Sequence, residues 1–135
     1  YFFPPTDIYD FFEKKINYLS SLGIKSSQII IDPGFGFGKT LDHNLALLGY
    51  LPIFHSLGVP IALGLSRKSI INEISLEKFK SAKNKFNYFS PNKRMGGSIA
   101  FALKAYNNGV QIIRTHDPFE TLQSIYCIEQ VDINL

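Results

Sequence analysis

The sequence predicts an α/β fold in which short parallel strands alternate with helices. Three apolar segments, at 28–32, 60–65 and 110–114, are the expected strands. The longer segments around them carry apolar residues at helical spacing. Strands that are apolar throughout and are separated by helices indicate a parallel sheet that is covered on both faces.

The first element in this pattern is a helix that ends before Gly23. Thr6 or Asp7 can cap its start, and a glycine in the position of Gly23 is a common helix stop. Its apolar positions are Ile8, Phe11, Phe12, Ile16 and Leu19. The first strand, "QIIID", follows and is bounded by Pro33 and Gly34.

A second helix is expected from Asp42 to about Ser56, with Gly58 as its end. Its inner face is predicted to consist of Leu45, Leu48, Leu51 and Phe54. The second strand, "PIALGL", then runs into "SRKS". An amphipathic stretch begins at Ile70 and leads into a polar loop.

The third helix is expected from about Lys93 to Asn107, with Gly109 after it. Small residues would allow this helix to pack closely: Gly96, Gly97, Ser98 and Ala100. The third strand, "VQIIR", is followed by "THD". The last helix has Pro118 in its first turn and runs to about Glu129.

The length of 135 residues suits one domain, 1–135, but three parallel strands do not close a barrel and leave exposed edges. A (β/α)8 barrel needs about 250 residues, so the chain resembles about half of one. A small independent open sheet is the alternative. The oily start "YFFPPTD", without a methionine, suggests the middle of a longer protein.

Composition and charge exclude several classes of function. The net charge is +3, but the lysines form no stripe, and those from Lys78 to Lys93 are interpreted as a solvated loop, so no nucleic-acid partner is expected. No apolar run reaches the ~18 residues of a membrane span, and no signal pattern is present. The single cysteine, Cys127, allows no internal disulfide and is expected to be buried. We therefore expect a soluble, cytoplasmic protein.

Each predicted strand ends in a polar cluster. Asp32 follows the first, Ser66 to Ser69 follow the second, and Arg114 to Asp117 follow the third. In α/β folds, chemistry collects at the C-terminal ends of parallel strands. The three clusters are therefore expected to converge on one site.

The glycine-rich stretch "DPGFGFGK", at 32–39, matches neither familiar nucleotide-binding loop. A P-loop would require glycine where Pro33 stands, and the glycines are each two apart, unlike the dinucleotide fingerprint. A carboxylate with nearby phenylalanines suits a flat, nitrogen-rich ring. A structural glycine loop, in which Asp32 caps its neighbour, fits the residues equally well.

The stretch "GLSRKS" is not a nucleophile elbow, because Lys68 stands where that motif needs glycine. It suggests an anion and ring-oxygen site at a helix start, where Ser69 can cap the helix. A plain helix cap with solvated cations is the alternative.

In "RTHD", Arg114 and His116 point to the same side of an extended segment, which favours an anion clamp. Asp117 or Thr115 can cap the next helix. Adjacent strand residues point in opposite directions, which argues against a catalytic triad. We assign no role to His43 or His55.

Taken together, these motifs resemble the dihydropteroate synthase family. The resemblance rests on "DPGFGFGK…HNLALL", "G.P.ALGLSRKSI", "RMGGSIAFALKA…G" and "IIRTHD", in that order, and it is weakest from Leu76 to Asn92. Pro118 departs from the family, which usually has valine there. The resemblance implies the C-terminal part, about the last three βα units, of a (β/α)8 TIM barrel, with the helix before them.

The resemblance also implies a role for each site residue. Asp32 would hydrogen-bond the pterin ring, beside Gly64, and Lys68 would reach the pterin oxygen and a ring nitrogen. Arg114 would cover the pterin face and, with His116, would hold the pyrophosphate. For p-aminobenzoate, the implied contacts are Ser69 at the carboxylate and Phe37 beside the ring.

The implied activity is the condensation of 6-hydroxymethyl-7,8-dihydropterin pyrophosphate with p-aminobenzoate in folate biosynthesis. The catalytic residues would be Lys68, Arg114 and His116. Mg²⁺ would be the cofactor, held by an asparagine in the missing N-terminal half, with no metal ligand in this chain. That missing half is the expected partner, the completed protein would form a homodimer and be a sulfonamide target, and the chain alone would be inactive.

Two alternatives remain open at this point. A related pterin-binding barrel, such as a methyltetrahydrofolate methyltransferase, shares the barrel and the ring-binding aspartate. It has no need for a pyrophosphate clamp, so "SRKS" and "RTHD" argue against it. The other alternative is a non-catalytic half-barrel that acts only in association.

Overall fold

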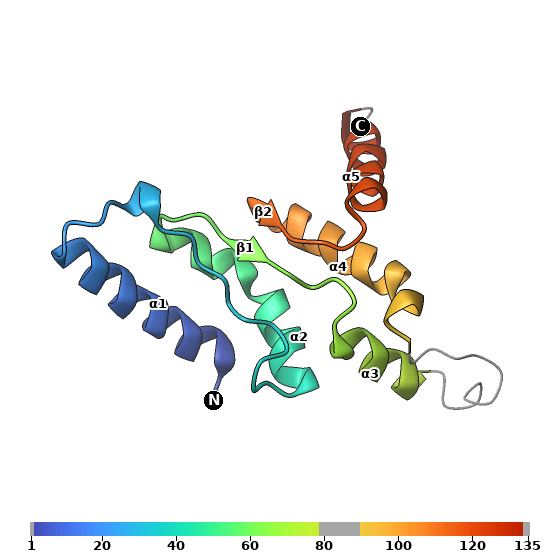
Figure 1. The fold of residues 1–135 in the computed structure, drawn as a ribbon, viewed down its shortest axis with the longest axis horizontal. Coiled ribbons are helices and arrows are strands. Elements are labelled where there is room, and N and C mark those ends of the chain that lie inside the picture. Colours follow the sequence, from blue (N-terminus) through green and yellow to red (C-terminus); the bar gives the residue numbers. More distant parts are fainter. Residues whose placement is uncertain (1, 79–89, 134–135) are drawn as a thin grey trace.

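The computed structural model describes residues 2–78 and 90–133. Most of the predicted loop between Lys78 and Lys93 lies outside the described residues. Figure 1 shows the arrangement of the elements. In chain order they are α1 (Pro4–Ser21), η1 (Ser26–Gln28), α2 (Leu41–Gly49), η2 (Leu51–Leu57), β1 (Ala62–Leu63), α3 (Ser69–Lys78), η4 (Pro91–Lys93), α4 (Met95–Asn107), β2 (Ile112–Ile113) and α5 (Pro118–Ile133).

The strands are parallel, as predicted, but they are shorter than the apolar segments that contain them. β1 and β2 pair with Ala62 opposite Ile112. The first predicted strand joins them through a parallel bridge between Ile31 and Ile61, in which the Ala62 amide donates to the Ile31 carbonyl at 2.8 Å. The three segments therefore lie side by side in chain order, as predicted for successive βα units.

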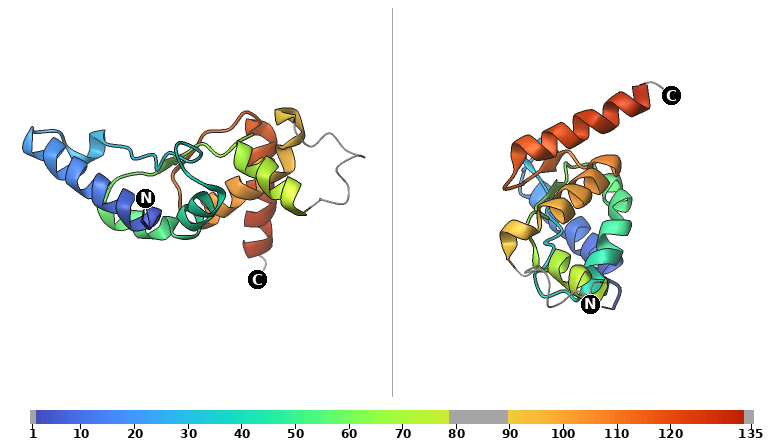
Figure 2. Two further views of the ribbon diagram at one scale, coloured as in Figure 1. Left: turned by 90° about the horizontal axis from the view of Figure 1, so that it is seen from below. Right: turned by 90° about the vertical axis from the view of Figure 1, so that its right-hand side faces the viewer.

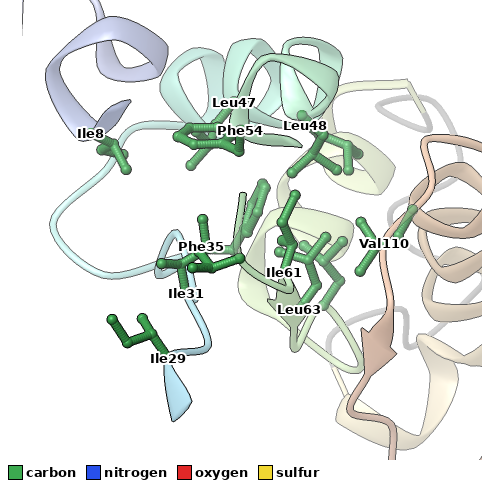
Figure 3. Close-up of a cluster of buried hydrophobic side chains, with 14 residues drawn as sticks. Ile8, Ile29, Ile31, Phe35, Leu47, Leu48, Phe54, Ile61, Leu63 and Val110 are labelled. Carbon is green, nitrogen blue, oxygen red and sulfur yellow. The ribbon is translucent and has the colours of Figure 1, made fainter. Parts of the chain in front are cut away.

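Only one face of this small sheet is covered in the described part of the chain. Ile31, Ile61 and Leu63 are almost fully buried against residues of α1, α2, η2 and α4 (Figure 3). The alternate positions point the other way, and Ile30 and Ile112 are 57% and 41% exposed. The prediction of burial on both faces was therefore wrong for Ile30 and Ile112. The helices that cover the sheet in the described residues pack against its other face, which carries Ile31, Ile61 and Leu63.

The predicted second helix is divided into two. α2 ends at Gly49, and the chain continues as the 3₁₀ helix η2, which has Pro52 in its first turn. Proline lacks the N–H that would extend the α-helical bonding pattern. The predicted inner face is correct for Leu48, Leu51 and Phe54, but Leu45 is 39% exposed and Leu47 is fully buried in its place.

Helix ends also differ from the predictions. α1 begins at Pro4, so Thr6 and Asp7 lie inside its first turn, where the Asp7 carboxylate accepts the backbone N–H of Phe2 at 2.8 Å. α5 begins at Pro118, as predicted, and extends beyond Glu129 to Ile133.

The predicted burial of Cys127 was wrong, because its side of α5 is exposed. α5 is tied to α4 by the Tyr106 hydroxyl, which donates to Glu129 at 2.6 Å, and its far end extends away from the other elements (Figure 2). In α4, close packing involves Gly97, where a Cβ would overlap Ile71, whereas Gly96 and Ala100 are exposed. Among the described helices, none is long and apolar enough to cross a membrane.

Candidate functional site

The open face of the sheet carries the predicted site residues at its C-terminal edge. Asp32, Gly64 and Arg114 each lie two residues beyond a residue on that face, and side chains alternate along extended backbone. The Arg114 amide still donates to the Leu63 carbonyl at 2.7 Å, which fixes its place beside the second strand. The three strand ends therefore converge, as predicted.

Gly64 leaves the space that the Arg114 side chain occupies. A Cβ on Gly64 would lie 2.7 Å from the Arg114 Nη2 and 2.9 Å from its Nε. The guanidinium can therefore lie across the end of β1, and its Nη2 is 3.9 Å from Oδ2 of Asp32. The Arg114 and Asp32 side chains are 74% and 43% exposed, so this loose ion pair is open to solvent.

The two carboxylate oxygens of Asp32 have different surroundings. Its Oδ1 accepts the backbone N–H of Gly34 at 2.9 Å, which is the structural cap. Its Oδ2 faces Arg114 and the open side of the sheet. One carboxylate oxygen therefore shapes the loop, and the other can accept a hydrogen bond from a ligand.

The glycine-rich loop is not a phosphate cradle. Gly34, Gly36 and Gly38 have φ of +71°, +81° and +61°, values that favour glycine. Lys39, in the position where a P-loop lysine would reach phosphates, donates to the carbonyls of Gly34 at 2.7 Å and Phe37 at 3.3 Å. Burial lowers the pKa of the Lys39 ammonium, and the nearby Asp32 charge partly opposes this effect.

Lys68 and Phe37 come from different loops and meet above the strand ends. The Lys68 Nζ lies 4.4 Å from the centre of the Phe37 ring, within the range of a cation–π contact. The Lys68 side chain also packs beside Gly36, where a Cβ would lie 3.6 Å from Cδ of Lys68, an ordinary van der Waals distance. The Phe37 ring is 68% exposed, so its other surface is free to stack against a flat ligand.

His116 is held by Ser66. The Ser66 hydroxyl oxygen lies 3.0 Å from the His116 Nδ1 and accepts the His116 backbone N–H at 3.3 Å. Both predicted members of the anion clamp line one hollow of about 420 Å³. Its lining residues are Gly64, Ser66, Lys68, Arg114, Thr115 and His116. Lys68, Arg114 and His116 can each present a donor, so the hollow suits an anionic ligand.

Ser69 lies at the start of α3, near this hollow but outside its lining. It is the first residue of the helix rather than the residue before it, so it does not occupy the predicted cap position. The helix N-terminus itself is where it was expected, directly after Lys68. The proposed contact of Ser69 with a carboxylate stays a prediction.

The contacts of three residues were missed by the sequence reasoning. Arg67 forms a short ion pair with Asp117, at 2.6 Å, whereas Asp117 had been considered only as a helix cap. Thr115 Oγ1 accepts the Asp117 backbone N–H at 3.2 Å. Asn44, buried in α2, binds the glycine-rich loop. An asparagine on an otherwise apolar helix face is the one signal that pointed to Asn44.

The described residues offer no cluster of three or more His, Cys, Asp or Glu side chains that would hold a metal ion. The Asp32 carboxylate beside the hollow already faces Arg114, and the Asp117 carboxylate is bound by Arg67. The predicted Mg²⁺ and its ligand in another part of the protein stay predictions.

The family to which the chain belongs follows from comparison with known proteins. The model of the pterin binding enzyme family matches residues 5–116, so the chain is a member of the pterin-binding enzymes. Dihydropteroate synthase of Escherichia coli K12 is 36% identical over 119 residues, which are 88% of this chain and 38% of that protein. Dihydropteroate synthase of Neisseria meningitidis serogroup B is 40% identical over 116 residues, 84% of this chain and 37% of that protein.

Solved structures agree. Dihydropteroate synthase from Xanthomonas albilineans, in complex with 7,8-dihydropteroate, has a TM-score of 0.84 at 32% identity and covers 98% of this chain and 46% of its own. The Yersinia pestis dihydropteroate synthase, in complex with a sulfonamide drug, has a TM-score of 0.82 at 35% identity, and the match covers 100% of this chain and 45% of that protein. These likenesses confirm the predicted fold, the C-terminal part, about the last three βα units, of a (β/α)8 barrel. The chain spans less than half the length of these relatives.

Proposed function

We propose that this chain forms the C-terminal half of a dihydropteroate synthase and supplies one wall of its active site. The observation that carries the proposal is the convergence of three successive strand ends. Lys68 and Arg114 line one open hollow, and Asp32 lies beside it, 3.9 Å from the Arg114 Nη2. Relatives of similar fold have been solved with 7,8-dihydropteroate and with 4-aminobenzoate, which supports the choice of substrates.

The pterin would bind at the open face near Asp32. Its amino-pyrimidine edge presents N–H donors, and the Asp32 Oδ2 is free of the Gly34 cap. The Arg114 guanidinium, lying across Gly64, would cover the ring face. Lys68 would donate to the ring oxygen and a ring nitrogen from the neighbouring loop.

The pyrophosphate end would lie in the hollow between Arg114 and His116. Arg114 offers a fork of N–H donors, and His116 is oriented by Ser66. p-Aminobenzoate would bind against Phe37, whose exposed ring can stack on the substrate ring. Its carboxylate would then meet the N-terminus of α3 at Ser69.

The reaction breaks the bond between the pterin methylene carbon and the pyrophosphate oxygen, and the pyrophosphate leaves with the electron pair. The aniline nitrogen attacks that carbon and loses a proton. The residues of this chain would place the two rings and stabilise the charge on the leaving group. We propose that Mg²⁺, held by residues outside this chain, supplies Lewis-acid assistance.

The two competing functions are less well supported. A methyltransferase of the same barrel type would use a ring-binding aspartate but would not need three N–H donor side chains, Lys68, Arg114 and His116, around one hollow. An association module would need no ligand-binding site. The close packing of the Arg114 guanidinium over Gly64, beside an open hollow, is not accounted for by that function.

Asp32→Asn and Lys68→Ala in the full-length gene product test the proposal. Calorimetric titration with a dihydropterin should show a loss of about tenfold to more than a hundredfold in affinity, because a hydrogen bond to a charged group contributes roughly 1.5–3 kcal/mol. Unchanged affinity in both variants would contradict the proposed pterin site. Release of pyrophosphate from the two substrates, in the presence of Mg²⁺, should be lost in the same variants.

A further inference from the structure

Arg67 has an unusual backbone conformation for its residue type. Its φ is +58°, and among the described residues every other positive φ belongs to glycine. This left-handed region is disfavoured for a residue with a side chain, and such residues persist where surrounding contacts hold them. Arg67 lies between Ser66 and Lys68, both of which line the hollow.

The backbone of Arg67 is held on both sides by the start of α4. Its N–H donates to the Ser98 hydroxyl at 2.9 Å, and its carbonyl accepts from the Arg94 Nη1 at 2.8 Å. The Ser98 hydroxyl in turn donates to the Arg94 carbonyl at 2.8 Å. Ser98 is buried, so these contacts are shielded from competing water.

The side chain of Arg67 connects two loops of the site. Its Nη2 and Nε donate to the two carboxylate oxygens of Asp117, at 2.6 Å and 3.3 Å, and its Nη1 donates to the Asn92 Oδ1 at 3.2 Å. Asp117 is 8% exposed and directly precedes α5. The loop that follows β1 is therefore joined to the loop that follows β2 by a two-pronged ion pair.

The residues on either side of Arg67 contact different parts of the site. Ser66 holds His116, and Lys68 covers the Phe37 ring at 4.4 Å. Arg67 itself is absent from the lining of the hollow, so it would act through its neighbours and not by touching a ligand.

We propose that Arg67 is a positioning residue that holds the Ser66–His116 and Lys68–Phe37 pairs in one arrangement and so couples the anion end of the site to its ring end. This inference deepens the proposed function and rests on it for the identity of the ligands. Two features of Arg67 would produce this positioning: its left-handed backbone and its ion pair with Asp117.

The experiment uses the full-length gene product and the variants Arg67→Ala, Arg67→Lys, Arg67→Gly and Asp117→Asn. Inorganic pyrophosphate and 4-aminobenzoate are titrated separately into each. Arg67→Ala should weaken both by about tenfold or more, the loss expected when a charged hydrogen bond is removed. Arg67→Lys should recover only part of the loss, because lysine keeps the charge but not the planar fork.

The glycine variant separates the effect of the left-handed backbone from that of the side-chain ion pair. Glycine accepts the left-handed backbone without strain but has no side chain. Arg67→Gly should therefore melt at a higher temperature than Arg67→Ala and yet bind both ligands as weakly. A glycine variant with wild-type affinities would overturn the role of the side chain.

A double-variant cycle and a matched control complete the test. Asp117→Asn should reproduce most of the Arg67→Ala loss, and the double variant should lose little more, since the two residues act as one unit. Tyr106→Phe removes a hydrogen bond between α4 and α5 that lies outside the site, and it should alter the melting temperature without altering either affinity.

The imidazole NMR signals of His116 give a readout that needs no ligand. They should shift in Arg67→Ala and Arg67→Lys and stay in place in Tyr106→Phe. Unshifted signals together with unchanged affinities in Arg67→Lys, the variant most certain to fold, would overturn the inference. If the wild-type protein bound neither probe while the His116 signals still moved, the proposed function would fail and the positioning role would stand.

Discussion

At the scale of single residues, Gly64 makes a sharp test of the site. A methyl group there would lie 2.7 Å from Nη2 of Arg114, the far end of a flexible side chain, so Gly64→Ala should displace the guanidinium and leave the fold intact. Affinity for pyrophosphate should fall about tenfold, while the free energy of unfolding changes by less than about 1 kcal/mol. Calorimetric titration and thermal melting of the full-length protein check both values.

Gly49→Ala is the matched control for this prediction. Nothing lies within 4 Å of a Cβ at that position, at the end of α2. Its pyrophosphate affinity should equal that of the wild type. If both alanine variants bound alike, Arg114 would not depend on the space above Gly64.

The residues that line the site could be predicted because they follow directly from local rules. Alternation along a strand places Arg114 and His116 together, and each strand end contributes its own polar cluster. The Arg67–Asp117 pair could not be predicted in this way. It joins residues 50 positions apart, and neither its left-handed backbone nor its partner leaves a local pattern.

At the scale of an element, the glycine-rich loop depends on one buried side chain of the next helix. Asn44 is 3% exposed. Its Oδ1 accepts the Gly36 amide at 2.8 Å, and its Nδ2 donates to the carbonyls of Lys39 and Thr40 at 3.3 Å and 2.8 Å. The loop that presents Phe37 to Lys68 is therefore fastened to α2 at three points.

We expect Asn44→Asp to release this loop more than Asn44→Ala does. Aspartate still accepts from Gly36, but its second oxygen would face two carbonyl oxygens without a proton to share. The loss should be about 1–3 kcal/mol in the free energy of unfolding, measured by urea denaturation, since buried groups would be left unsatisfied. Because the chain has no tryptophan, Phe37→Trp gives a single fluorescent reporter of the loop.

In that reporter background, both Asn44 variants should shift the tryptophan emission and lower its anisotropy. Asn107→Ala, at an exposed position at the end of α4, serves as the control and should leave the emission unchanged. An emission that did not respond to either Asn44 variant would show that α2 does not set the position of Phe37.

The order and type of most elements could be predicted from apolar spacing, whereas their packing could not. The helix break at Pro52 follows from the residue itself. The burial of Leu47 instead of the predicted Leu45 depends on how α2 packs against α1 and the sheet. The exposure of Ile30 and Ile112 has the same origin. A pattern of apolar residues shows that a strand can be covered on both faces, but it does not show which neighbours are present to cover it.

At the scale of the whole molecule, two apolar surfaces in the described part of the chain remain open. One is the sheet face that carries Ile30 and Ile112. The other is a groove of about 500 Å³ on α5, lined by Phe119, Leu122, Gln123, Tyr126, Cys127 and Gln130. In a closed (β/α)8 barrel, neighbouring strands and helices cover such surfaces, and this chain matches 38% of its Escherichia coli relative.

We therefore predict that the 135-residue chain by itself has no dihydropteroate synthase activity and self-associates through these surfaces. Co-expression with the N-terminal part that its relatives possess should first restore a defined size in light scattering and then activity with both substrates and Mg²⁺.

Cys127 reports the covering of the α5 groove directly, because it is exposed in that groove and is the sole thiol of the chain. Its alkylation by a maleimide should be fast in the separate chain and slow in the completed protein. Hydrogen exchange of the backbone amides of α2 is the control, and it should be the same in both. A monodisperse separate chain that turned over both substrates would contradict the half-barrel interpretation and favour a self-contained small α/β enzyme.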